Sequence, residues 1–526
     1  MRQRLILLLI LCLWMLPSKG QYYFNERNTV HSFTSLFTSV VQLNGKYYCT
    51  GIGVDSIKLD TAYYGVKFVV FDNVGNKIKD TVFLMPYKNI YTWGNNLQVT
   101  KDGNLLLAAY DIDKDINNRA LIIKFDTAGH ALWYKEYDQP FCNSVKWYQT
   151  YDLKATGTGE WIMLLDNGCN PPALRNSFVL TKLDSNFNLM WVKSINPYGP
   201  SDDPYHILID NDGNYILAGC WTDAVYNIQS SYLYRGELIK TDTAGNIVWV
   251  WRSDSTREMF TIQDVIRTKD SGYVYCGTIG YQDVSSGFSE LYWKGWIEKL
   301  DKNRNVLWND SISYLYSNID FEQKVLKELP DGDIVMAGTM IGGFDTALTA
   351  VPGLENYATL IKYSPNGIRK WRRHYQIPID SFQYRVYDMK QTADKGYVLV
   401  GDANNLTPNR ISPVDRSWII KVDSNGCNSP TDPQCQPVST TNWQLPNVYV
   451  NVYPNPAHDI VNIRTTELQN AQVIITDMAG RICMQQAFSN NTYMQSIRIT
   501  SLPSGMYFYK IMQAGLAIAI GKLVKQ

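Results

Sequence analysis

Acidic side chains between the apolar segments of this 526-residue chain have the clearest capacity for chemistry. Two carboxyl groups on either side of a scissile glycosidic bond can act as general acid and base. Acids scattered over a polar surface are also expected of a protein without activity, so a degradative site is the alternative interpretation. The candidates, all in segments that we predict to be loops, are Asp202, Asp203, Asp223, Glu290, Glu355, Asp402 and Asp415.

Aromatic residues in the same predicted loops could stack on sugar rings, because burying an aromatic face against a ligand removes apolar surface from water. Packing of these side chains within their own loops is the simpler interpretation. The candidates for ligand stacking are Trp221, Tyr234, Tyr292, Trp293 and Tyr357.

Asp111, Asp113 and Asp115 have the alternate spacing with which carboxylate oxygens bind calcium. A calcium loop of the EF-hand type would also need Gly at its sixth position and Glu at its twelfth, where this chain has Ile116 and Ile122. The pattern therefore indicates a solvated loop rather than a metal site.

Other catalytic motifs are missing from the sequence, which has no GxSxG elbow, no Walker loop and no GxGxxG before a helix. No two of its five histidines have metal-ligand spacing. We therefore predict no catalytic residue, no metal and no cofactor. The histidines are His31, His130, His206, His374 and His458.

Two sequence patterns recur along the chain, and the strands and turns that they predict must position any site. The first pattern is a polar turn followed by a short apolar strand, as in NDGNYILAG from Asn211. Six further copies bring the total to seven: NGKYYCTG from Asn44, KDGNLLLAA from Lys101, GTGEWIMLL from Gly157, DSGYVYCGT from Asp270, PDGDIVMAGT from Pro330 and DKGYVLVGD from Asp394.

The second pattern is a strand, a DxxG turn and another strand, as in ELIKTDTAGNIVWVW from Glu237. Asp followed three residues later by Gly suits a hairpin in which Gly takes the left-handed conformation. Phe187 and Arg304 replace that Gly in two copies, so we expect the left-handed residue to shift to Asn186 or Asn303. The first turn position is filled by Asp72, Asp126, Asp184, Asp242, Asp301, Ser364 and Asp423, at spacings of 54, 58, 58, 59, 63 and 59.

A Trp follows this turn in five copies, and its fixed strand position predicts core packing between neighbouring units rather than a ligand platform. These residues are Trp133, Trp191, Trp249, Trp308 and Trp371.

Seven units of four short strands predict an all-β fold, a seven-bladed β-propeller over residues 21–426. The pattern loosely resembles bacterial secreted propellers. Because the seventh unit stops at Gly426, one strand is missing. We predict that the segment from Gln21 to Val30 supplies it, with residues near Tyr22 to Phe24 pairing with Trp418 to Val422.

Antiparallel strands alternate direction, so both kinds of turn lie on one face and the longer connections lie on the opposite face. We call this second face the long-loop face and expect any binding surface there. Its predicted loops span residues 53–64, 109–118, 221–234, 279–293, 340–357 and 402–415.

Cysteines and both ends of the chain indicate export. Arg2 and Arg4 precede an apolar run and then small residues, which predicts a signal peptide over residues 1–20. We expect disulfides between Cys427 and Cys435 and between Cys142 and Cys169, and no transmembrane helix in the mature chain. The remaining cysteines, predicted to be buried and apolar, are Cys49, Cys220, Cys276 and Cys483.

Residues 447–526 follow a linker over 427–446 and read as a small Ig-like β-sandwich of short strands. Their motifs are YPNPAHD from Tyr453, ITDMAGR from Ile475, LPSGMYFYKI from Leu502 and the terminal GKLVKQ. Together these resemble the type A C-terminal sorting domain of the type IX secretion system of Bacteroidota. The positions that match the family pattern are Tyr453, Pro454, Asn455, Pro456, Gly480, Gly505, Tyr507 and Lys522.

This resemblance implies recognition by the type IX translocon, removal of the domain, and either release or attachment to surface lipopolysaccharide. It implies a secreted or outer-membrane-surface protein and assigns no catalytic role. Lys and Arg total 49, as do Asp and Glu, which argues against a nucleic-acid partner.

We therefore expect a propeller that acts as a binding or adhesion module for an extracellular glycan or protein. The alternative is a polysaccharide- or peptide-degrading enzyme with carboxylates on the long-loop face. A quinone-dependent dehydrogenase ranks last, because such propellers typically have eight blades.

Overall fold

The computed structural model is all-β and describes residues 22–28, 34–58, 61–115, 117–138, 148–167, 178–195, 201–222, 234–253, 259–283, 290–312, 321–341, 356–377, 382–405, 415–432, 434–435, 443–444, 450–468, 471–477, 481–488, 492–513 and 516–526. The chain forms two compact units, one reaching to Gln434 and the other containing the residues from Cys435 to Gln526. No helix of the described residues is long and apolar enough to cross a membrane.

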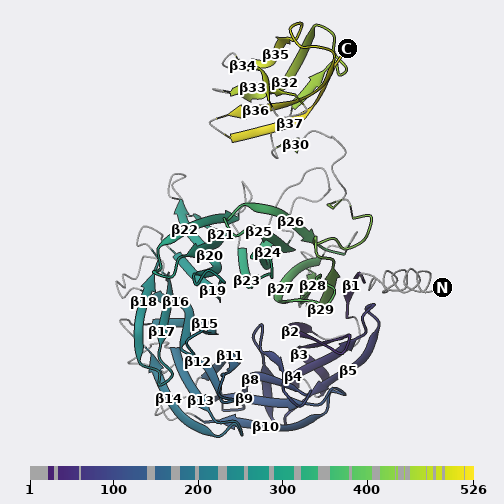
Figure 1. Cartoon of the computed structure of the whole chain (residues 1–526). Coiled ribbons are helices and arrows are strands. Elements are labelled where there is room, and N and C mark those ends of the chain that lie inside the picture. Colours follow the sequence, from purple (N-terminus) through teal and green to yellow (C-terminus); the bar gives the residue numbers. More distant parts are fainter. Residues whose placement is uncertain are drawn as a thin grey trace, which may run out of the picture. The chain divides into compact units, whose positions relative to one another are not determined.

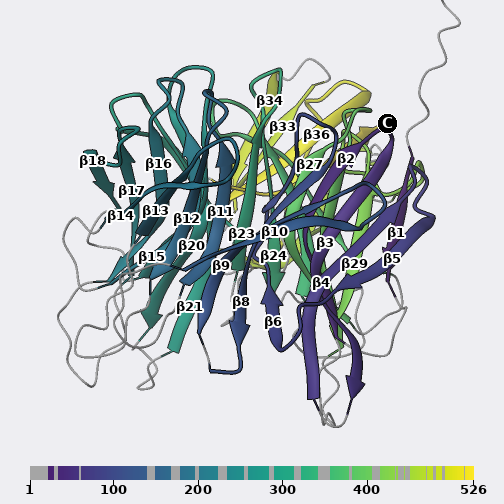
Figure 2. The same ribbon diagram turned by 90° about the horizontal axis from the view of Figure 1, so that it is seen from below.

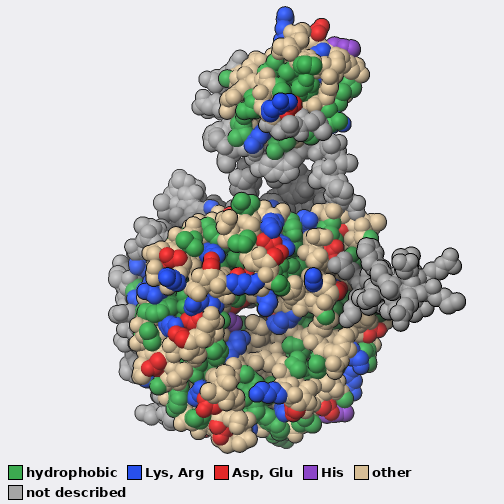
Figure 3. All heavy atoms as spheres, viewed as in Figure 1, with side chains coloured by type: hydrophobic (Ala, Val, Ile, Leu, Met, Phe, Trp, Pro, Cys, Tyr) green, Lys and Arg blue, Asp and Glu red, His purple; other side chains and the backbone are tan. Residues whose placement is uncertain are grey.

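The first unit is a seven-bladed propeller, in which seven antiparallel sheets form a ring (Figure 1). The space-filling view shows an opening at its centre, the central channel (Figure 3). Blade 1 contains β2 (Ser35–Leu43), β3 (Lys46–Lys58), β4 (Thr61–Phe71) and β5 (Lys77–Phe83). Blade 2 contains β6 (Lys88–Tyr91), β7 (Leu97–Val99), β8 (Leu105–Asp113), β9 (Asn118–Phe125) and β10 (Ala131–Tyr137). Blade 3 contains β11 (Tyr148–Ala155), β12 (Trp161–Asn167), β13 (Phe178–Leu183) and β14 (Leu189–Ile195).

Blade 4 contains β15 (Ser201–Ile209), β16 (Tyr215–Thr222), β17 (Tyr234–Thr241) and β18 (Ile247–Arg252). Blade 5 contains β19 (Met259–Arg267), β20 (Tyr273–Asp283), β21 (Glu290–Leu300) and β22 (Val306–Ile312). Blade 6 contains β23 (Phe321–Glu328), β24 (Ile334–Ile341), β25 (Asn356–Tyr363) and β26 (Arg369–Tyr375). Blade 7 contains β27 (Phe382–Gln391), β28 (Tyr397–Asn405), β29 (Asp415–Val422) and β1 (Phe24–Arg27).

The ring closes as predicted, because β1 pairs antiparallel with β29 and completes blade 7. The register pairs Phe24 with Lys421 and Arg27 with Trp418, so the strand begins two residues after Tyr22. Phe24 is buried in a cluster that joins blades 7 and 1. Burial of such a ring stabilises the closed ring by roughly 1.5–3 kcal/mol.

Each blade interface is a separate hydrophobic cluster, because both faces of every sheet are covered by neighbouring blades. The repeated Trp residues pack as expected against the turn of the following blade. Trp133 contacts Phe187 with ring centroids 5.0 Å apart, and the guanidinium of Arg304 lies 4.8 Å from the Trp249 ring. At the other five interfaces, a Cβ on the turn Gly would lie close to the ring of Trp191, Trp308, Trp371, Phe68 or, at the closure, Phe24.

This packing explains a wrong prediction. The left-handed residues of the two atypical turns are Phe187 (φ 61°) and Arg304 (φ 70°), rather than Asn186 and Asn303. Each backbone keeps the conformation of the other copies because the turn hydrogen bonds are the same, with Phe187 N–H donating to Asp184 O at 3.0 Å. Contact with the preceding Trp stabilises the side chain that stands in the place of Gly.

Figure 2 views the propeller from the side, and both kinds of short turn lie on one face of it as predicted. The predicted loops on the opposite face are too long, because the flanking strands extend into them. The β3 and β4 hairpin leaves only residues 59–60 between its strands, and β8 and β9 leave only residues 114–117. Continued ladder pairing satisfies backbone groups that a loop would leave to water.

The second unit is a β-sandwich of two sheets that enclose one core. Its strands are β30 (Trp443–Gln444), β31 (Val450–Tyr453), β32 (Ile460–Leu468), β33 (Ala471–Thr476), β34 (Ile482–Ala487), β35 (Thr492–Arg498), β36 (Gly505–Gln513) and β37 (Leu516–Lys525). The predicted domain limits of 1–20, 21–426, 427–446 and 447–526 stay predictions.

Cys427 and Cys435 are disulfide-bonded, as expected. Cys142 and Cys169 lie outside the described residues. Three of the four remaining cysteines are buried thiols, and burial raises the pKa of the Cys49 and Cys276 thiols. The prediction fails for Cys483, which is exposed because it lies on the outer side of the edge strand β34.

Candidate binding site in the central channel

The innermost strand of nearly every blade carries a β-bulge, an extra unpaired residue that redirects its side chain. Register shifts place these bulges in the middle of β2, β11, β15, β19, β23 and β27. All six strands border the central channel in Figure 1. The extra residues are Thr38, Tyr151, Tyr205, Gln263, Lys324 and Tyr387.

Blade 2 departs from the predicted four strands, because its inner strand is divided into β6 and β7, which both pair with β8. The connecting loop, residues 92–96, crosses the inner strand of blade 1, where Asn95 N–H donates to Thr38 O at 3.2 Å. A Cβ on Gly94 would lie 2.5 Å from Tyr387 O, so this close approach requires glycine. The loop thus places Trp93 and Asn95 in the channel.

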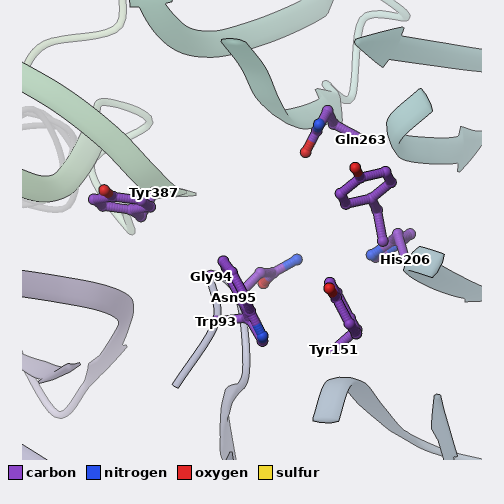
Figure 4. A pocket seen from close by; sticks show the side chains of 8 residues that line it. Trp93, Gly94, Asn95, Tyr151, His206, Gln263 and Tyr387 are labelled. Carbon is purple, nitrogen blue, oxygen red and sulfur yellow. The ribbon is translucent and has the colours of Figure 1, made fainter. Parts of the chain in front are cut away.

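A cavity of about 290 Å³ lies between this loop and the inner strands of blades 3, 4, 5 and 7, near the small end of the range for ligand pockets. Trp93 stacks on Tyr151 with centroids 5.3 Å apart and planes 9° apart, and Tyr205 meets Tyr151 edge-on at 6.0 Å. Figure 4 shows Tyr387 on the opposite side from Tyr151 and His206. The amides of Asn95 and Gln263 supply polar groups to the same cavity.

His206 lies at the cavity wall between two buried carboxyl groups. Its Nδ1 is 2.9 Å from Asp152 Oδ2, and its Nε2 is 3.2 Å from Asp264 Oδ1. The imidazole thus has an acidic side chain facing each of its two nitrogens.

Asp152 and Asp264 also join neighbouring blades by accepting backbone hydrogen bonds from the next blade. Asp152 accepts from Leu153 N–H at 2.8 Å and from Ile207 N–H of the next blade at 3.1 Å. Asp264 and Asp388 repeat this arrangement, with Leu326 N–H and Val40 N–H as the donors from the following blades. At these three bulges, the aspartate that follows the extra residue thus fixes neighbouring inner strands relative to one another.

The two carboxyls titrate differently. Burial opposes ionisation of Asp152, but Lys154 and His206 outweigh it, and the pKa of Asp152 is below its ordinary value. Burial raises the pKa of Asp264, and the attraction of His206 only partly offsets this. Burial also raises the pKa of the Tyr151 phenol, which therefore stays neutral at neutral pH.

The aromatic residues predicted to stack on a ligand do not line this cavity. Trp221 is half-buried, with the guanidinium of Arg252 4.1 Å from its ring and that of Arg235 at 5.7 Å. Tyr234 begins the neighbouring strand β17 and, paired with Thr222, faces the other side of the sheet. The ring of Tyr357, in blade 6, lies 6.1 Å from that of His374.

Tyr292 and Trp293 pair with Tyr281 and Gly280 in blade 5, and their side chains lie outside the described part of the chain. The structure therefore places the five predicted residues in three separate blades.

Among the predicted loop carboxylates, Asp402 lies in β28 rather than in a loop, is buried, and pairs with Arg385. Asp203 lies in β15 and is half-buried, with Cys220 Sγ 3.9 Å from its Oδ2. The side chains of the other five lie outside the described residues.

Two aspartates of the DxDxD spacing, Asp111 and Asp113, contact cations or amides. Asp111 is buried beside Lys88 and Arg119, and Asp113 pairs with Arg119 at 2.6 Å. Within the described residues, no group of three or more His, Cys, Asp or Glu has an arrangement that could hold a metal ion.

In the sandwich, the predicted sorting positions connect the start of the domain with its last strand. Asn455 Nδ2 donates to Lys522 O at 2.7 Å, and Val524 N–H donates to Asn455 Oδ1 at 2.9 Å. The hydroxyl of Tyr507 donates to Pro503 O at 2.8 Å, which fixes the loop before β36.

The other sorting positions take less part in such contacts. Tyr453 is partly exposed, with its hydroxyl 3.5 Å from Met494 Sδ. Gly505 begins β36, and a Cβ there would meet the ring of Tyr507 at 3.9 Å. Pro454 and Pro456 both follow cis peptide bonds. Gly480 lies outside the described residues.

Sequence reasoning missed the channel residues because it treated the inner strands as scaffold. A signal was present, since a bulge residue is followed by an acid or His and then by an apolar residue. This pattern recurs as YDL at Tyr151, YHI at Tyr205, QDV at Gln263 and YDM at Tyr387.

Comparison with known proteins separates the two units. Residues 451–526 match the family model described as the secretion system C-terminal sorting domain. No curated protein matches the sequence.

Solved structures similar to the chain include both enzymes and a protein not named as one. Drosophila Semaphorin 2a is 10% identical with a TM-score of 0.44, covering 97% of this chain and 99% of that one. Polysaccharide lyase Uly1 is 10% identical with a TM-score of 0.43, covering 77% and 93%. The periplasmic gluconolactonase PpgL of Pseudomonas aeruginosa is 11% identical with a TM-score of 0.38, covering 71% and 97%. At these values the likenesses carry no functional conclusion.

The ring of seven sheets identifies the first unit as a propeller, and the matched family model identifies the domain after it as a secretion sorting domain. Such a domain directs a protein to the cell surface or the extracellular space. The chain is therefore a secreted β-propeller protein that ends in a type IX secretion C-terminal sorting domain.

Proposed function

We propose that the propeller is a binding module for extracellular saccharides and that its site is the cavity in the central channel. The observation that carries this proposal is the aromatic wall of Trp93, Tyr151 and Tyr205, together with the amides of Asn95 and Gln263. Sugar rings present apolar C–H faces that stack on such rings, and their hydroxyls pair with amides.

The chemistry of the channel favours binding over catalysis. Both nitrogens of His206 face the buried carboxyl groups of Asp152 and Asp264. The neutral phenol of Tyr151 is a hydrogen-bonding group rather than a base. Asp402, a described member of the predicted catalytic carboxylates, is already paired with Arg385.

Titration of oligosaccharides into the mature secreted chain tests this proposal, with binding followed by calorimetry. We expect Trp93→Ala to weaken saccharide binding about tenfold or more, since a stacked aromatic contributes on the order of 1 kcal/mol beyond its buried area. Tyr134→Ala is the matched control, because Tyr134 is 49% exposed on the outer strand β10. This control should bind normally.

Prolonged incubation of the same sugars with the protein provides the opposing test. New reducing ends or unsaturated products would show turnover and would overturn the binding proposal in favour of a degradative enzyme. Failure of all saccharides to bind, with a protein ligand captured instead, would also contradict it.

Recognition and removal of the sorting domain during export are a second part of this proposal. We propose that the outer-membrane translocon recognises the sandwich through its last strand, β37, which is hydrogen-bonded to Asn455. We propose that the domain is then removed. Mass spectrometry of the surface or medium form should find a C-terminus before Val450, the first residue of β31.

A further inference from the structure

Three lysines occupy the same position on three inner strands, three residues after the bulge. Lys154 follows Tyr151 on β11, Lys327 follows the bulge of β23, and Lys390 follows Tyr387 on β27. Since the inner strands run toward the short-turn face, these lysines lie on that side of the aromatic cavity. Figure 3, which views this face, shows Lys and Arg side chains around the central opening.

Lys390 brings its charge to the cavity wall. Its Nζ lies 2.7 Å from Oδ1 of Asn95, a residue that lines the cavity, and 2.6 Å from Asp388 Oδ1. Because Lys390 belongs to blade 7 and Asn95 to blade 2, the ammonium group lies inside the channel beside the inner strand of blade 1.

Lys154 lies on β11, the strand that supplies Tyr151 to the cavity wall. Its Nζ is 2.7 Å from Asp152 Oδ1, and its charge also acts on Asp264 two blades away. The ammonium group therefore lies in front of the inner strands, beside the carboxyl groups that hold His206.

Lys327 supplies a charge that its own strand does not neutralise. Where Lys154 and Lys390 have Asp two residues before them, Lys327 has Val325, which is buried in the interface with blade 7. Lys327 is exposed, and no described carboxylate forms an ion pair with it. Asp152 pairs with Lys154 and Asp388 pairs with Lys390, so Lys327 adds a positive charge with which no described carboxylate pairs.

We infer that the channel takes an acidic saccharide, whose carboxylate or sulfate group is bound by Lys327 with Lys390 and Lys154 beside it. The inference rests on the proposed saccharide site and names its ligand class. The sugar ring lies against Trp93 and Tyr151, and the anionic group points toward the short-turn face. Ammonium groups form charge-assisted hydrogen bonds with anionic oxygens, and these are stronger than hydrogen bonds between neutral groups.

Matched pairs of ligands test the inference with the full mature chain. One pair is oligogalacturonate and its methyl ester, and the other is a sulfated galactan oligomer and its desulfated form. We expect the charged member of at least one pair to bind about tenfold tighter at low salt. This preference should fall several-fold at 0.5 M NaCl, where the Debye length is only about 4 Å. The two pairs distinguish carboxylate from sulfate recognition.

Lys327→Gln is the decisive variant, because it removes the unmatched charge without breaking an ion pair between described residues. It should weaken binding of the acidic ligand about five- to tenfold and leave the neutral ligand unchanged. Lys302→Gln removes the same charge from an exposed turn between the outer strands β21 and β22 and should have no effect.

Equal affinity for both members of both pairs would overturn the inference, as would equal losses in the two lysine variants. In either case a loss of binding in Trp93→Ala would leave the proposed saccharide site intact. If neither form of any saccharide binds, the proposed function fails and this inference fails with it.

Discussion

Asp152 shows how much of the propeller depends on single side chains at the channel. Its carboxylate accepts two backbone N–H bonds, one of them from the next blade, and contacts both His206 and Lys154. The side chain is fully buried, so no water can replace these partners. An acid in an apolar strand is a weak signal in the sequence, and only the neighbouring blade reveals its role.

Replacing this acid should therefore destabilise the propeller strongly. We expect Asp152→Ala to lower the free energy of unfolding by about 3–5 kcal/mol, because it removes the carboxylate partner of two buried N–H groups, of the His206 ring and of the Lys154 ammonium group. Urea denaturation of the mature chain measures the change, with Asp115→Ala as an exposed control. A loss no larger than that of the control would show that these contacts contribute little.

The buried carboxyl group of Asp111 should make the stability of the propeller depend on pH. Burial and the charge of Glu136 raise the pKa of its carboxyl to about 6 from 3.8, although Lys88 and Arg119 oppose the shift. Because the folded-state pKa lies above the unfolded one, folding favours the neutral acid. The stabilisation is therefore present below about pH 4 and is lost as the pH rises through about 6.

Asp111→Asn should remove this loss of stability at higher pH, because the amide does not ionise. Between pH 4 and 7 the wild type should lose up to about 3 kcal/mol relative to the variant, given about 1.4 kcal/mol for each pKa unit. Denaturation curves of both proteins at several pH values check the prediction. Parallel stability profiles over this range would contradict it.

At the scale of elements, the turns show where sequence patterns hold and where they fail. Asp and Gly three residues apart predicted the hairpins correctly, and five of these glycines have positive φ. The pattern failed at Phe187 and Arg304, because contact with a Trp of the preceding blade is absent from any local rule. The divided inner strand of blade 2 was missed for the same reason, since its loop is held by blades 1 and 7.

The turn at Asp394 to Gly396 offers a test of this local conformation. Lys395 is exposed and has φ 66°, where the corresponding turns have Gly213 and Gly332. Lys395→Gly should stabilise the propeller by about 0.5–1 kcal/mol, because a left-handed residue with a Cβ is strained by about 1–2 kcal/mol and Gly adds unfolded-state entropy. Thermal denaturation measures the gain.

Gly396→Ala provides the contrast within the same turn. A Cβ there would lie 2.2 Å from Val422 O, so this variant should be clearly destabilised. A Lys395→Gly protein no more stable than Lys395→Ala would argue against strain at this position.

At the scale of the whole molecule, the sorting domain and the propeller are separate compact units with separate tasks. Deleting residues 447–526 should leave a folded propeller in the periplasm, because each blade interface has its own hydrophobic core. Protease treatment of intact cells and circular dichroism of the recovered protein measure exposure and folding. Surface exposure of the truncated chain would refute the role of the domain in export.

The sequence by itself determined the features that depend on local periodicity. These are the seven repeated units, the missing strand supplied by the N-terminal segment, the inter-blade Trp packing and the sorting motifs. Each of these features depends on residues that lie near one another in the chain or recur at a fixed interval. The preferences of strands and turns alone can therefore predict them.

Only the tertiary structure decided where the candidate site lies. Trp93, Tyr151, Tyr205 and Tyr387 come from four blades, and a bulge or a crossing loop turns each toward the channel. A bulge depends on the register with the neighbouring strand, and the loop depends on backbone contacts across blade 1. Ring closure brings these side chains together, and no pattern within one repeat contains that information.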